Sequence, residues 1–234
     1  MKPGRSLARG VKNRLVPKGE RTYRLPLGIG RGLRVEIDLE HWTYLYLGLY
    51  ERELNPHIRE LCRPGSRCFD VGGQNGYDAL LFAKLGAMAV LSFDCDAIAC
   101  ARMTRAFSNN PSLAARLDVR HTTIAARSDP AANQTTLDEA AFAPDGFVPD
   151  LVKIDIEGAE LQALKGARKL LLRRRPHLII EVHDQTIENE CQTLLEEHGY
   201  TPRTVDHSRW LGDGRPSGFN RWIVAITPPS QPRR

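Results

Sequence analysis

Residues 68–85 read CFDVGGQNGYDALLFAKL, a short apolar run joined to a longer apolar-rich stretch by a glycine-rich turn. The run 68–71 is typical of a strand that is covered on both faces. Residues 76–85 predict a helix, which Gly86 ends. A strand that turns through glycines straight into a helix indicates the first unit of a parallel α/β sheet.

The same alternation of strands and helices continues to about residue 205. Further strands are expected at residues 34–39, 89–93, 119–125, 151–154 and 178–182, and helices at 97–107, 159–172 and 187–198. Residues 41–61 predict two helical pieces interrupted by Pro56. Two last strands, 200–205 and 222–226, have no helix between them and predict an antiparallel edge hairpin with the long loop 206–219. The pattern as a whole favours an α/β fold with helices on both faces of a mostly parallel sheet.

The composition is that of an ordinary globular protein. Of the 234 residues, 41% are hydrophobic and 26% are charged, which excludes the disordered and coiled-coil classes. Because no run of about 18 apolar residues is present, we expect no transmembrane segment. Residues 1–20 lack the apolar region of a secretory signal. The five cysteines form no C-x-x-C pair, so we expect no disulfide framework and place the protein in the cytoplasm.

Positive charge is concentrated at the N-terminus. The chain has 33 Lys and Arg against 28 Asp and Glu, a net charge of +5, yet residues 1–34 alone hold ten basic residues and one acid. We therefore expect a basic arm at 1–32, a strand-helix cap at 33–66, the main domain at 67–228 and a tail at 229–234. The arm either makes a weak contact with an anionic surface or is a solvated leader. Its scarcity of aromatic residues argues against nucleic acid as a partner.

Acidic residues follow four of the expected strands. Asp70, Asp94 and Asp155 each end a strand, and Glu181 precedes His183 at the end of another. The carboxyl ends of parallel strands form the ligand-binding edge of such a sheet. An edge lined by carboxylates suits a cationic ligand and repels a polyanionic one.

The first glycine turn distinguishes between cofactors. A dinucleotide site needs G-x-G-x-x-G to hold pyrophosphate, whereas this turn reads G-G-x-x-G after Asp70, which would repel a phosphate. S-adenosylmethionine carries an ammonium group, a sulfonium and a ribose diol, and no phosphate. Asp70 suits the ammonium, Asp94 lies 24 residues further on and suits the ribose hydroxyls, and Gly72 and Gly76 allow close approach of the backbone. The alternative is a plain turn whose glycines serve packing.

Three stretches resemble the FkbM family of S-adenosylmethionine-dependent methyltransferases. They are residues 69–78 (FDVGGQNGYD), 150–168 (DLVKIDIEGAELQALKGAR) and 176–184 (PHLIIEVHD), with weaker matches at 47–51 (LGLYE) and 136–138 (TLD). The resemblance covers roughly residues 33–205. The family usually has Asn at the position of Gln74 and Glu-Pro at the position of Asp94-Cys95, and both departures keep the polar type.

The resemblance implies a class I methyltransferase fold, Rossmann-like, with a mostly parallel seven-stranded sheet in residues 67–228. It also implies S-adenosyl-L-methionine as cofactor, held by Asp70, Gly72, Gln74, Gly76 and Asp94. The reaction it implies is O-methylation of a hydroxyl on a sugar or secondary metabolite, that is, a small-molecule or glycan acceptor.

The acceptor side is expected at the ends of two neighbouring strands. Asp155 is the expected acceptor-side carboxylate, and His183 is the expected general base because its ordinary pKa lies near neutrality. Glu157 is a third catalytic candidate. The alternatives are a structural histidine for His183, placement at a helix start for Glu157, and a pairing of Glu181 with Lys153 inside the sheet.

Other functions are also open at this point. Asp155, Glu157, Glu181 and His183 have the chemistry of a magnesium or manganese site, but the resemblance requires no metal and we expect none. The basic arm favours a nucleic-acid methyltransferase, yet the sequence after residue 154 is D-I-E-G rather than the N/D-P-P-Y/F of enzymes that methylate exocyclic amines. A catalytically silent scaffold that keeps the cofactor pocket is the third possibility.

Overall fold

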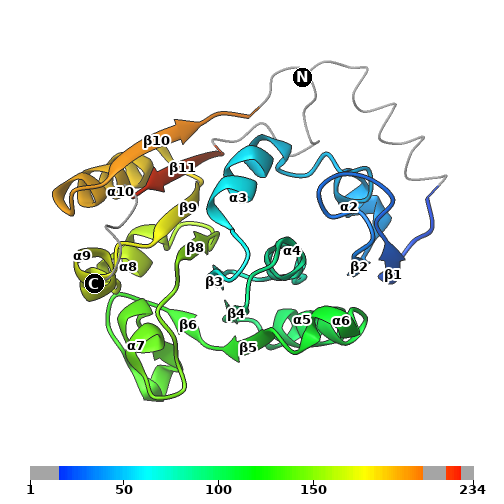
Figure 1. The fold of residues 1–234 in the computed structure, drawn as a ribbon, viewed down its shortest axis with the longest axis horizontal. Coiled ribbons are helices and arrows are strands. Elements are labelled where there is room, and N and C mark those ends of the chain that lie inside the picture. Colours follow the sequence, from blue (N-terminus) through cyan, green and yellow to red (C-terminus); the bar gives the residue numbers. More distant parts are fainter. Residues whose placement is uncertain (1–15, 208–219, 228–234) are drawn as a thin grey trace.

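A computed structural model describes residues 16–207 and 220–227 of the chain. A seven-stranded sheet forms its centre, in the order β10-β11-β9-β8-β3-β4-β5 (Figure 1). The strands are β3 (Arg67–Val71), β4 (Ala89–Asp94), β5 (Leu117–His121), β8 (Leu151–Ile154), β9 (His177–Val182), β10 (Thr201–Val205) and β11 (Arg221–Ile226). Neighbouring strands from β5 to β9 are parallel, and β11 is antiparallel to both β9 and β10. The α/β fold and its antiparallel edge hairpin are therefore confirmed.

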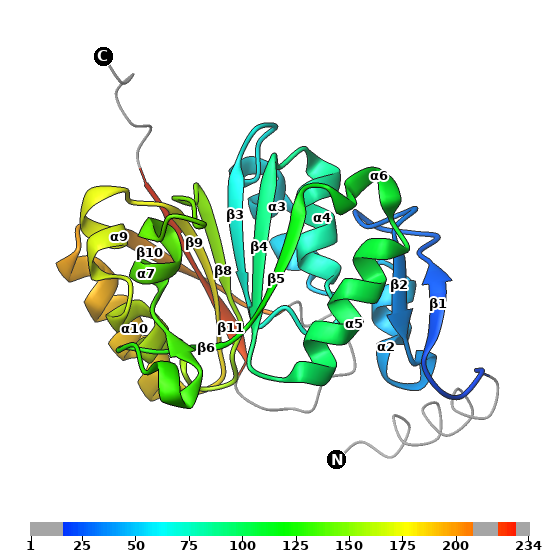
Figure 2. The same cartoon turned by 90° about the horizontal axis from the view of Figure 1, so that it is seen from below.

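Helices cover both faces of this sheet (Figures 1 and 2). The helices are α2 (Leu39–Tyr46), α3 (Asn55–Leu61), α4 (Tyr77–Leu85), α5 (Ala97–Ser108), α6 (Pro111–Ala114), α7 (Leu137–Phe142), α8 (Glu160–Lys165), α9 (Arg168–Arg173) and α10 (Gln185–Glu197), with 3-10 turns η1 (Arg52–Leu54) and η2 (Pro130–Ala132). One core packs α2 to α5 against one face, and a second core packs α7 to α10 against the other. No helix in the described part of the chain is long and apolar enough to cross a membrane.

The strand order reverses between β3 and β8, which lie side by side although four helices, α4 to α7, and four strands, β4 to β7, separate them in the sequence. Ligands of open α/β sheets bind at the carboxyl ends of the strands beside such a reversal. This point lies where the glycine turn after β3 meets the end of β8, so the fold itself locates the candidate site.

The N-terminal part of the chain contains an element that the sequence analysis does not predict. Strand β1 (Arg21–Arg24) pairs antiparallel with β2 (Arg34–Ile37), within the segment assigned to the basic arm. Leu25 and Ile29 between the two strands are buried in the first core. The Arg-rich strand carries no alternating apolar pattern, because backbone pairing with β2 rather than burial forms it. Residues 1–15, the loop residues 208–219 and the tail lie outside the described residues.

Three boundaries differ from expectation. The break in the helical region 41–61 falls after α2, and Pro56 instead occupies the first turn of α3, where its missing N–H is harmless. The expected helix 159–172 is two helices, separated at Gly166 and Ala167. Gly166 lies so close to Ala125 that a Cβ would be 2.2 Å from its carbonyl oxygen. The expected strand 119–125 divides into β5 and the short β6 (Thr123–Ile124), which pairs with β7 (Gln134–Thr135).

Candidate active site

The glycine turn after β3 packs directly onto the end of β8. The N–H groups of Gly72 and Gly73 donate to the Phe93 carbonyl at 2.8 and 3.1 Å, which ties the turn to β4. Gly72 has φ of 89°, and a Cβ there would lie 1.8 Å from the carbonyl oxygen of Asp155. Gly76, with φ of 76°, starts α4. The turn therefore requires glycine at position 72 both for its backbone conformation and for space.

Asp70 lies beneath this turn and is only 1% exposed. The Ser92 hydroxyl donates to Asp70 Oδ2 at 3.1 Å. Burial raises the pKa of Asp70 to about 7, and the nearby Asp78 carboxylate adds to this effect. A cation beside Asp70 would stabilise its ionised form, so the electrostatics of this position suit the ammonium group that the sequence analysis assigns to it.

Asp94 stands at the end of β4 and is half-buried. Its Oδ2 accepts the backbone N–H of Gln74 at 3.0 Å, and its Oδ1 accepts that of Asp96 at 2.9 Å. Each carboxylate oxygen has a second lone pair, so two ribose hydroxyls can donate to Asp94 in addition. Gln74 has φ of 46° and an exposed side chain, and its described contact with Asp94 is made by its backbone.

We predict that Asp94→Asn weakens binding of S-adenosylhomocysteine at least about tenfold, because a hydrogen bond to a charged group contributes about 1.5–3 kcal/mol. Isothermal titration calorimetry measures the change. The matched control is Asp96→Asn, two residues away, because Asp96 caps α5 by accepting the Ile98 N–H and asparagine caps helices equally well. Equal affinities of the two variants would remove Asp94 from the cofactor site.

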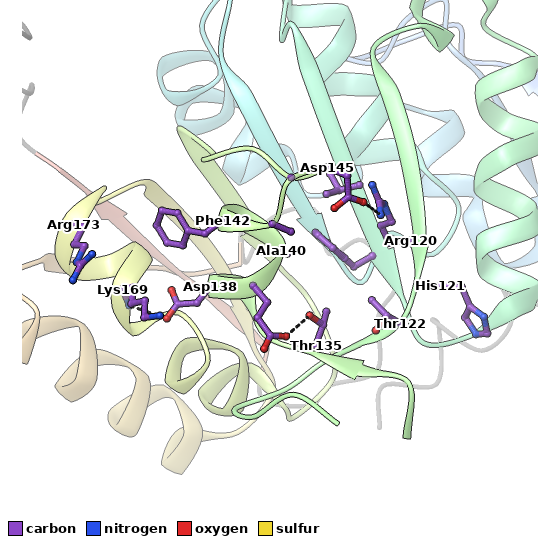
Figure 3. Close-up of a pocket in the computed structure, with 15 residues that line it drawn as sticks. Arg120, His121, Thr122, Thr135, Asp138, Ala140, Phe142, Asp145, Lys169 and Arg173 are labelled. Atoms are coloured by element: carbon purple, nitrogen blue, oxygen red, sulfur yellow. Dashed lines mark hydrogen bonds and ion pairs between the residues drawn. The ribbon is translucent and has the colours of Figure 1, made fainter. Parts of the chain in front are cut away.

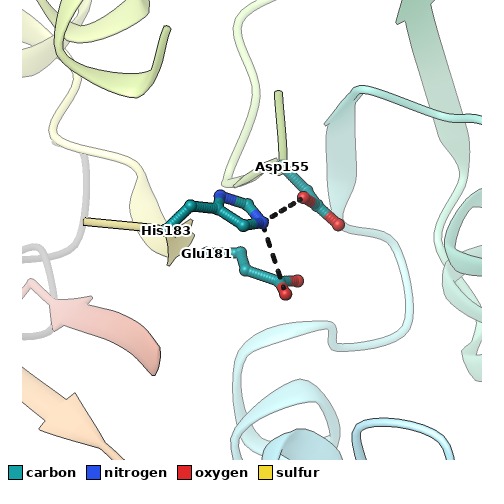
Figure 4. A group of neighbouring side chains, drawn as sticks. All are labelled: Asp155, Glu181 and His183. Atoms are coloured by element: carbon teal, nitrogen blue, oxygen red, sulfur yellow. Dashed lines mark ion pairs between the residues drawn. The ribbon is translucent and has the colours of Figure 1, made fainter. Parts of the chain in front are cut away.

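The acceptor-side residues meet at the ends of β8 and β9 (Figure 4). His183 Nε2 lies 3.8 Å from Asp155 Oδ1 and 3.7 Å from Glu181 Oε1. Asp155 and His183 are thus brought together as expected. The Trp222 indole N–H donates to Glu181 Oε2 at 3.3 Å. Burial raises the pKa of Asp155, and the Lys153 ammonium works against this rise.

Glu160 orients the His183 ring from the opposite side. His183 Nδ1 lies 3.3 Å from Glu160 Oε1, and both oxygens of Glu160 accept the Gly158 N–H at 3.0 Å. Glu160 is fully buried, at 0% exposure. The Glu160 carboxylate is the main cause that raises the pKa of His183, with Asp155 adding to it. Because a carboxylate only accepts, Nδ1 carries the proton and Nε2 faces the two other carboxylates.

Glu157 does not join this group. It has φ of 48° in the turn before α8, and its side chain is exposed. Glu160, the next acid of the same turn, points inward in its place. The catalytic role of Glu157 stays a prediction, whereas Glu160 is a residue that the sequence analysis passed over. Its signal was present, since it is the second glutamate of the motif block 150–168.

Lys153 is a second group that the sequence analysis placed differently. Its ammonium lies 2.7 Å from Asp78 Oδ2, 3.5 Å from Glu51 Oε2 and 3.6 Å from Asp155 Oδ2. Asp78 and Glu51 belong to the stretches 69–78 and 47–51 that carry the family resemblance. Although burial opposes it, these carboxylates hold the pKa of Lys153 well above its ordinary value.

Three of the four residues considered for a metal site lie close together in the structure. Asp155, Glu181 and His183 each offer a ligand atom, and these atoms lie within 4.8 Å of one another. Two carboxylates and one imidazole suit a divalent cation. A protonated His183 would bring positive charge to the same position, since its Nε2 already faces both carboxylates.

A separate cavity of about 890 Å³ lies on the other face of the sheet (Figure 3). Its floor is made by Leu91 and Phe93 of β4, and α7 forms one wall. An ion pair of 2.6 Å between Arg120 and Asp145 lies within it. Leu91 and Phe93 belong to the second core. Asp70 is the cross-strand neighbour of Ser92, which lies between them on β4, so Asp70 points to the opposite face of the sheet, toward the first core. This cavity is therefore distinct from the carboxylate-lined edge.

Comparison with known proteins places the chain in a class. Residues 101–207 match the family model described as the methyltransferase FkbM domain. This match confirms the family resemblance that residues 150–168 and 176–184 carry. The comparison with curated proteins finds no match.

Solved structures share the fold at low sequence identity. The FkbM methyltransferase from Methylobacillus flagellatus KT is 19% identical with a TM-score of 0.56, covering 80% of this chain and 53% of that one. Human methyltransferase 10 domain containing protein is 15% identical with a TM-score of 0.56, covering 94% and 95%. Fibrillarin of Aeropyrum pernix, in complex with natively bound S-adenosyl-L-methionine, is 13% identical with a TM-score of 0.50, covering 71% and 68%.

The chain spans about half the length of the Methylobacillus protein. The shared fold confirms the class I methyltransferase architecture, with its Rossmann-like, mostly parallel sheet. The FkbM domain match and the shared fold together show that this chain is similar to methyltransferases.

Proposed function

We propose that the protein is an S-adenosylmethionine-dependent O-methyltransferase that acts on a hydroxyl of a small-molecule or glycan acceptor, such as a sugar or a secondary metabolite. The observation that carries this proposal is the placement of His183 and Asp155 beside the glycine turn, at one edge of the sheet. The glycine turn that would hold the cofactor therefore lies next to the residues that would take up the acceptor proton.

The residues around the glycine turn fit the cofactor. Asp70 offers a buried carboxylate to an ammonium group, and Asp94 retains acceptor capacity for a diol. Ile98, four residues after Asp94, leaves 66% of its surface exposed and offers an apolar surface to an adenine ring. The fibrillarin structure with its bound S-adenosyl-L-methionine has the same fold and supports this assignment.

The acceptor-side residues supply positioning and proton transfer. When bound, S-adenosylmethionine supplies the methyl group, which the acceptor oxygen takes as the carbon–sulfur bond breaks. His183 Nε2 receives the hydroxyl proton, Glu160 holds the ring through Nδ1, and Asp155 and Glu181 stabilise the imidazolium that forms. Glu157, exposed on the adjacent turn, is proposed to contact the acceptor.

Because the raised pKa of His183 keeps more of it protonated at neutral pH, and the base must be neutral, the rate is expected to increase as pH rises past the ordinary value of 6.5. The pH dependence of kcat measures this rise. A rate that stays level or falls over that interval would contradict a base role for His183.

We predict that His183→Ala lowers kcat by about 10²–10⁴-fold, the usual contribution of a general base. The dissociation constant of S-adenosylhomocysteine should stay within about twofold, since His183 lies on the acceptor side. His41→Ala is the matched control, because His41 is exposed on α2 and pairs with Asp38. Full turnover in the His183 variant would remove it from the mechanism.

The experiment that tests the function is incubation of the purified protein with methyl-labelled cofactor and a panel of glycosides, lipids and RNA. We expect label in a compound with a free hydroxyl and loss of that label with Asp155→Asn. Label confined to RNA would favour the nucleic-acid enzyme. Absence of a thermal shift with S-adenosylhomocysteine would indicate a silent scaffold, since any ligand of the native state stabilises it.

A further inference from the structure

A buried positive charge lies behind Asp155. Lys153 stands on the central strand β8 and is 2% exposed. Across the sheet it is the neighbour of Asp70 on β3, which in turn neighbours Ser92 on β4. A buried ammonium requires partners, and Asp78, in the first turn of α4, provides the closest at 2.7 Å.

Two further carboxylates share the same ammonium at almost equal distances. Glu51 Oε2 lies 3.5 Å from Lys153 Nζ, and Asp155 Oδ2 lies 3.6 Å from it. Glu51 belongs to the segment between α2 and η1, so its side chain enters the site from the N-terminal part of the chain. It is 3% exposed, and its backbone has φ of 42°, which is unfavourable for a residue with a side chain. A strained backbone that delivers a buried acid to a buried lysine indicates a constraint beyond packing.

We infer that Lys153 and Glu51 are positioning residues for Asp155: Lys153 holds the Asp155 carboxylate ionised and oriented toward the acceptor, and Glu51 moderates this by sharing the same ammonium. The N-terminal segment thereby sets the charge of a residue on the acceptor side. The importance of Asp155 for turnover rests on the proposed function, whereas the shared ion pair does not.

Other charged groups around Asp155 also influence its ionisation. Glu181 and His183 face it from the end of β9, and Asp70 and Asp78 are the further acids near Lys153. These groups stay the same when either positioning residue is changed. Loss of Lys153 removes the cation nearest to Asp155, and loss of the Glu51 charge removes an anion that competes with it. The two changes therefore act on Asp155 in opposite directions.

The test is a ¹³C NMR titration of the full chain labelled at the aspartate carboxyl carbons, with the Asp155 signal assigned by its loss in Asp155→Asn. Lys153→Met should raise the Asp155 midpoint by about 1–3 pH units, the range for an opposite charge within about 4–6 Å. Glu51→Gln should lower it by about 1 unit. Glu53→Gln is the matched control, because Glu53 lies two residues further on, in η1, and pairs with Arg52.

Shifts of the same sign in both variants, or no shift with Glu51→Gln, would overturn the inference. Should Lys153→Met fail to fold, the downward shift with Glu51→Gln decides alone, and Lys153→Arg should restore a midpoint close to that of the parent protein. Once an acceptor is known, the acidic limb of the kcat profile should move with the midpoint while the KM for the cofactor stays unchanged. Midpoints that move as expected in a protein without turnover would overturn the proposed function and leave this inference standing.

Discussion

Gly72→Ala is expected to abolish cofactor binding and to lower the free energy of unfolding by more than about 3 kcal/mol, beyond the usual range for an overpacked site. The added Cβ would lie 1.8 Å from the Asp155 carbonyl oxygen, a backbone atom directly after the central strand β8, where the Asp155 N–H is hydrogen-bonded to the Val71 carbonyl. The glycine turn would have to move away from the end of β8. This movement would disrupt the contact between the residues that bind the cofactor and those on the acceptor side. Urea denaturation and calorimetry with S-adenosylhomocysteine measure the two effects.

Gly65→Ala is the matched control for this prediction. Gly65 has φ of 87°, almost the same as the 89° of Gly72, but a Cβ there would meet nothing within 4 Å. The free energy of unfolding of Gly65→Ala should therefore fall only by the cost of placing alanine in the left-handed region, about 1–2 kcal/mol. This variant should bind the cofactor normally. If the two alanine variants are equally stable, the contact with β8 is not what demands glycine at position 72.

Asp70→Asn is expected to remove the pH dependence of cofactor affinity. Because burial raises the pKa of Asp70 to about 7, an ammonium ligand must displace a proton below that pH. Affinity for S-adenosylhomocysteine should then fall by up to about tenfold per pH unit below 7 in the parent protein. The asparagine variant should bind weakly at every pH. Exposed Asp118 provides the control, since Asp118→Asn should keep the full dependence.

The same substitution has an opposite effect on the unliganded protein. A carboxyl group whose pKa is raised by folding binds its proton more tightly in the native state, so its contribution to stability is lost as pH rises from about 4 to about 7. Asp70→Asn should therefore stabilise the unliganded protein at pH 8, by up to about 4 kcal/mol for a shift of about three units. A variant that is less stable at pH 8, or that keeps the affinity slope, would contradict the assignment of Asp70.

The sheet could be predicted from the sequence because its strands are short apolar runs that alternate with helices. The glycine turn identified the first unit, and the missing helix between the last two strands identified the hairpin. β1 could not be found this way, since an Arg-rich strand is stabilised by pairing with β2 and not by an apolar face. The close approach of Gly166 to Ala125, a residue 41 positions earlier in the chain, could not be predicted either, because it exists only in the folded chain.

The candidate site was predictable where strand ends determine it. Asp155 and His183 end neighbouring strands, so the topology alone brings them together. The pairing of Lys153 was not predictable, because Glu51 and Asp78 come from outside the sheet and reach it only in the folded chain. Glu160 and Glu157 are three residues apart in one turn, and only the backbone conformation of that turn determines which of them faces His183.

The central claim is that the edge between the turns after β3 and β4 binds a cationic, phosphate-free nucleoside. Its most direct test is calorimetric titration of the parent protein with S-adenosylhomocysteine and, separately, with NAD⁺, each repeated with Asp94→Asn. We expect saturable binding of S-adenosylhomocysteine at one site, weakened by the substitution, and no binding of NAD⁺. Binding of NAD⁺, or no binding of S-adenosylhomocysteine at any pH from 6 to 9, would contradict the account.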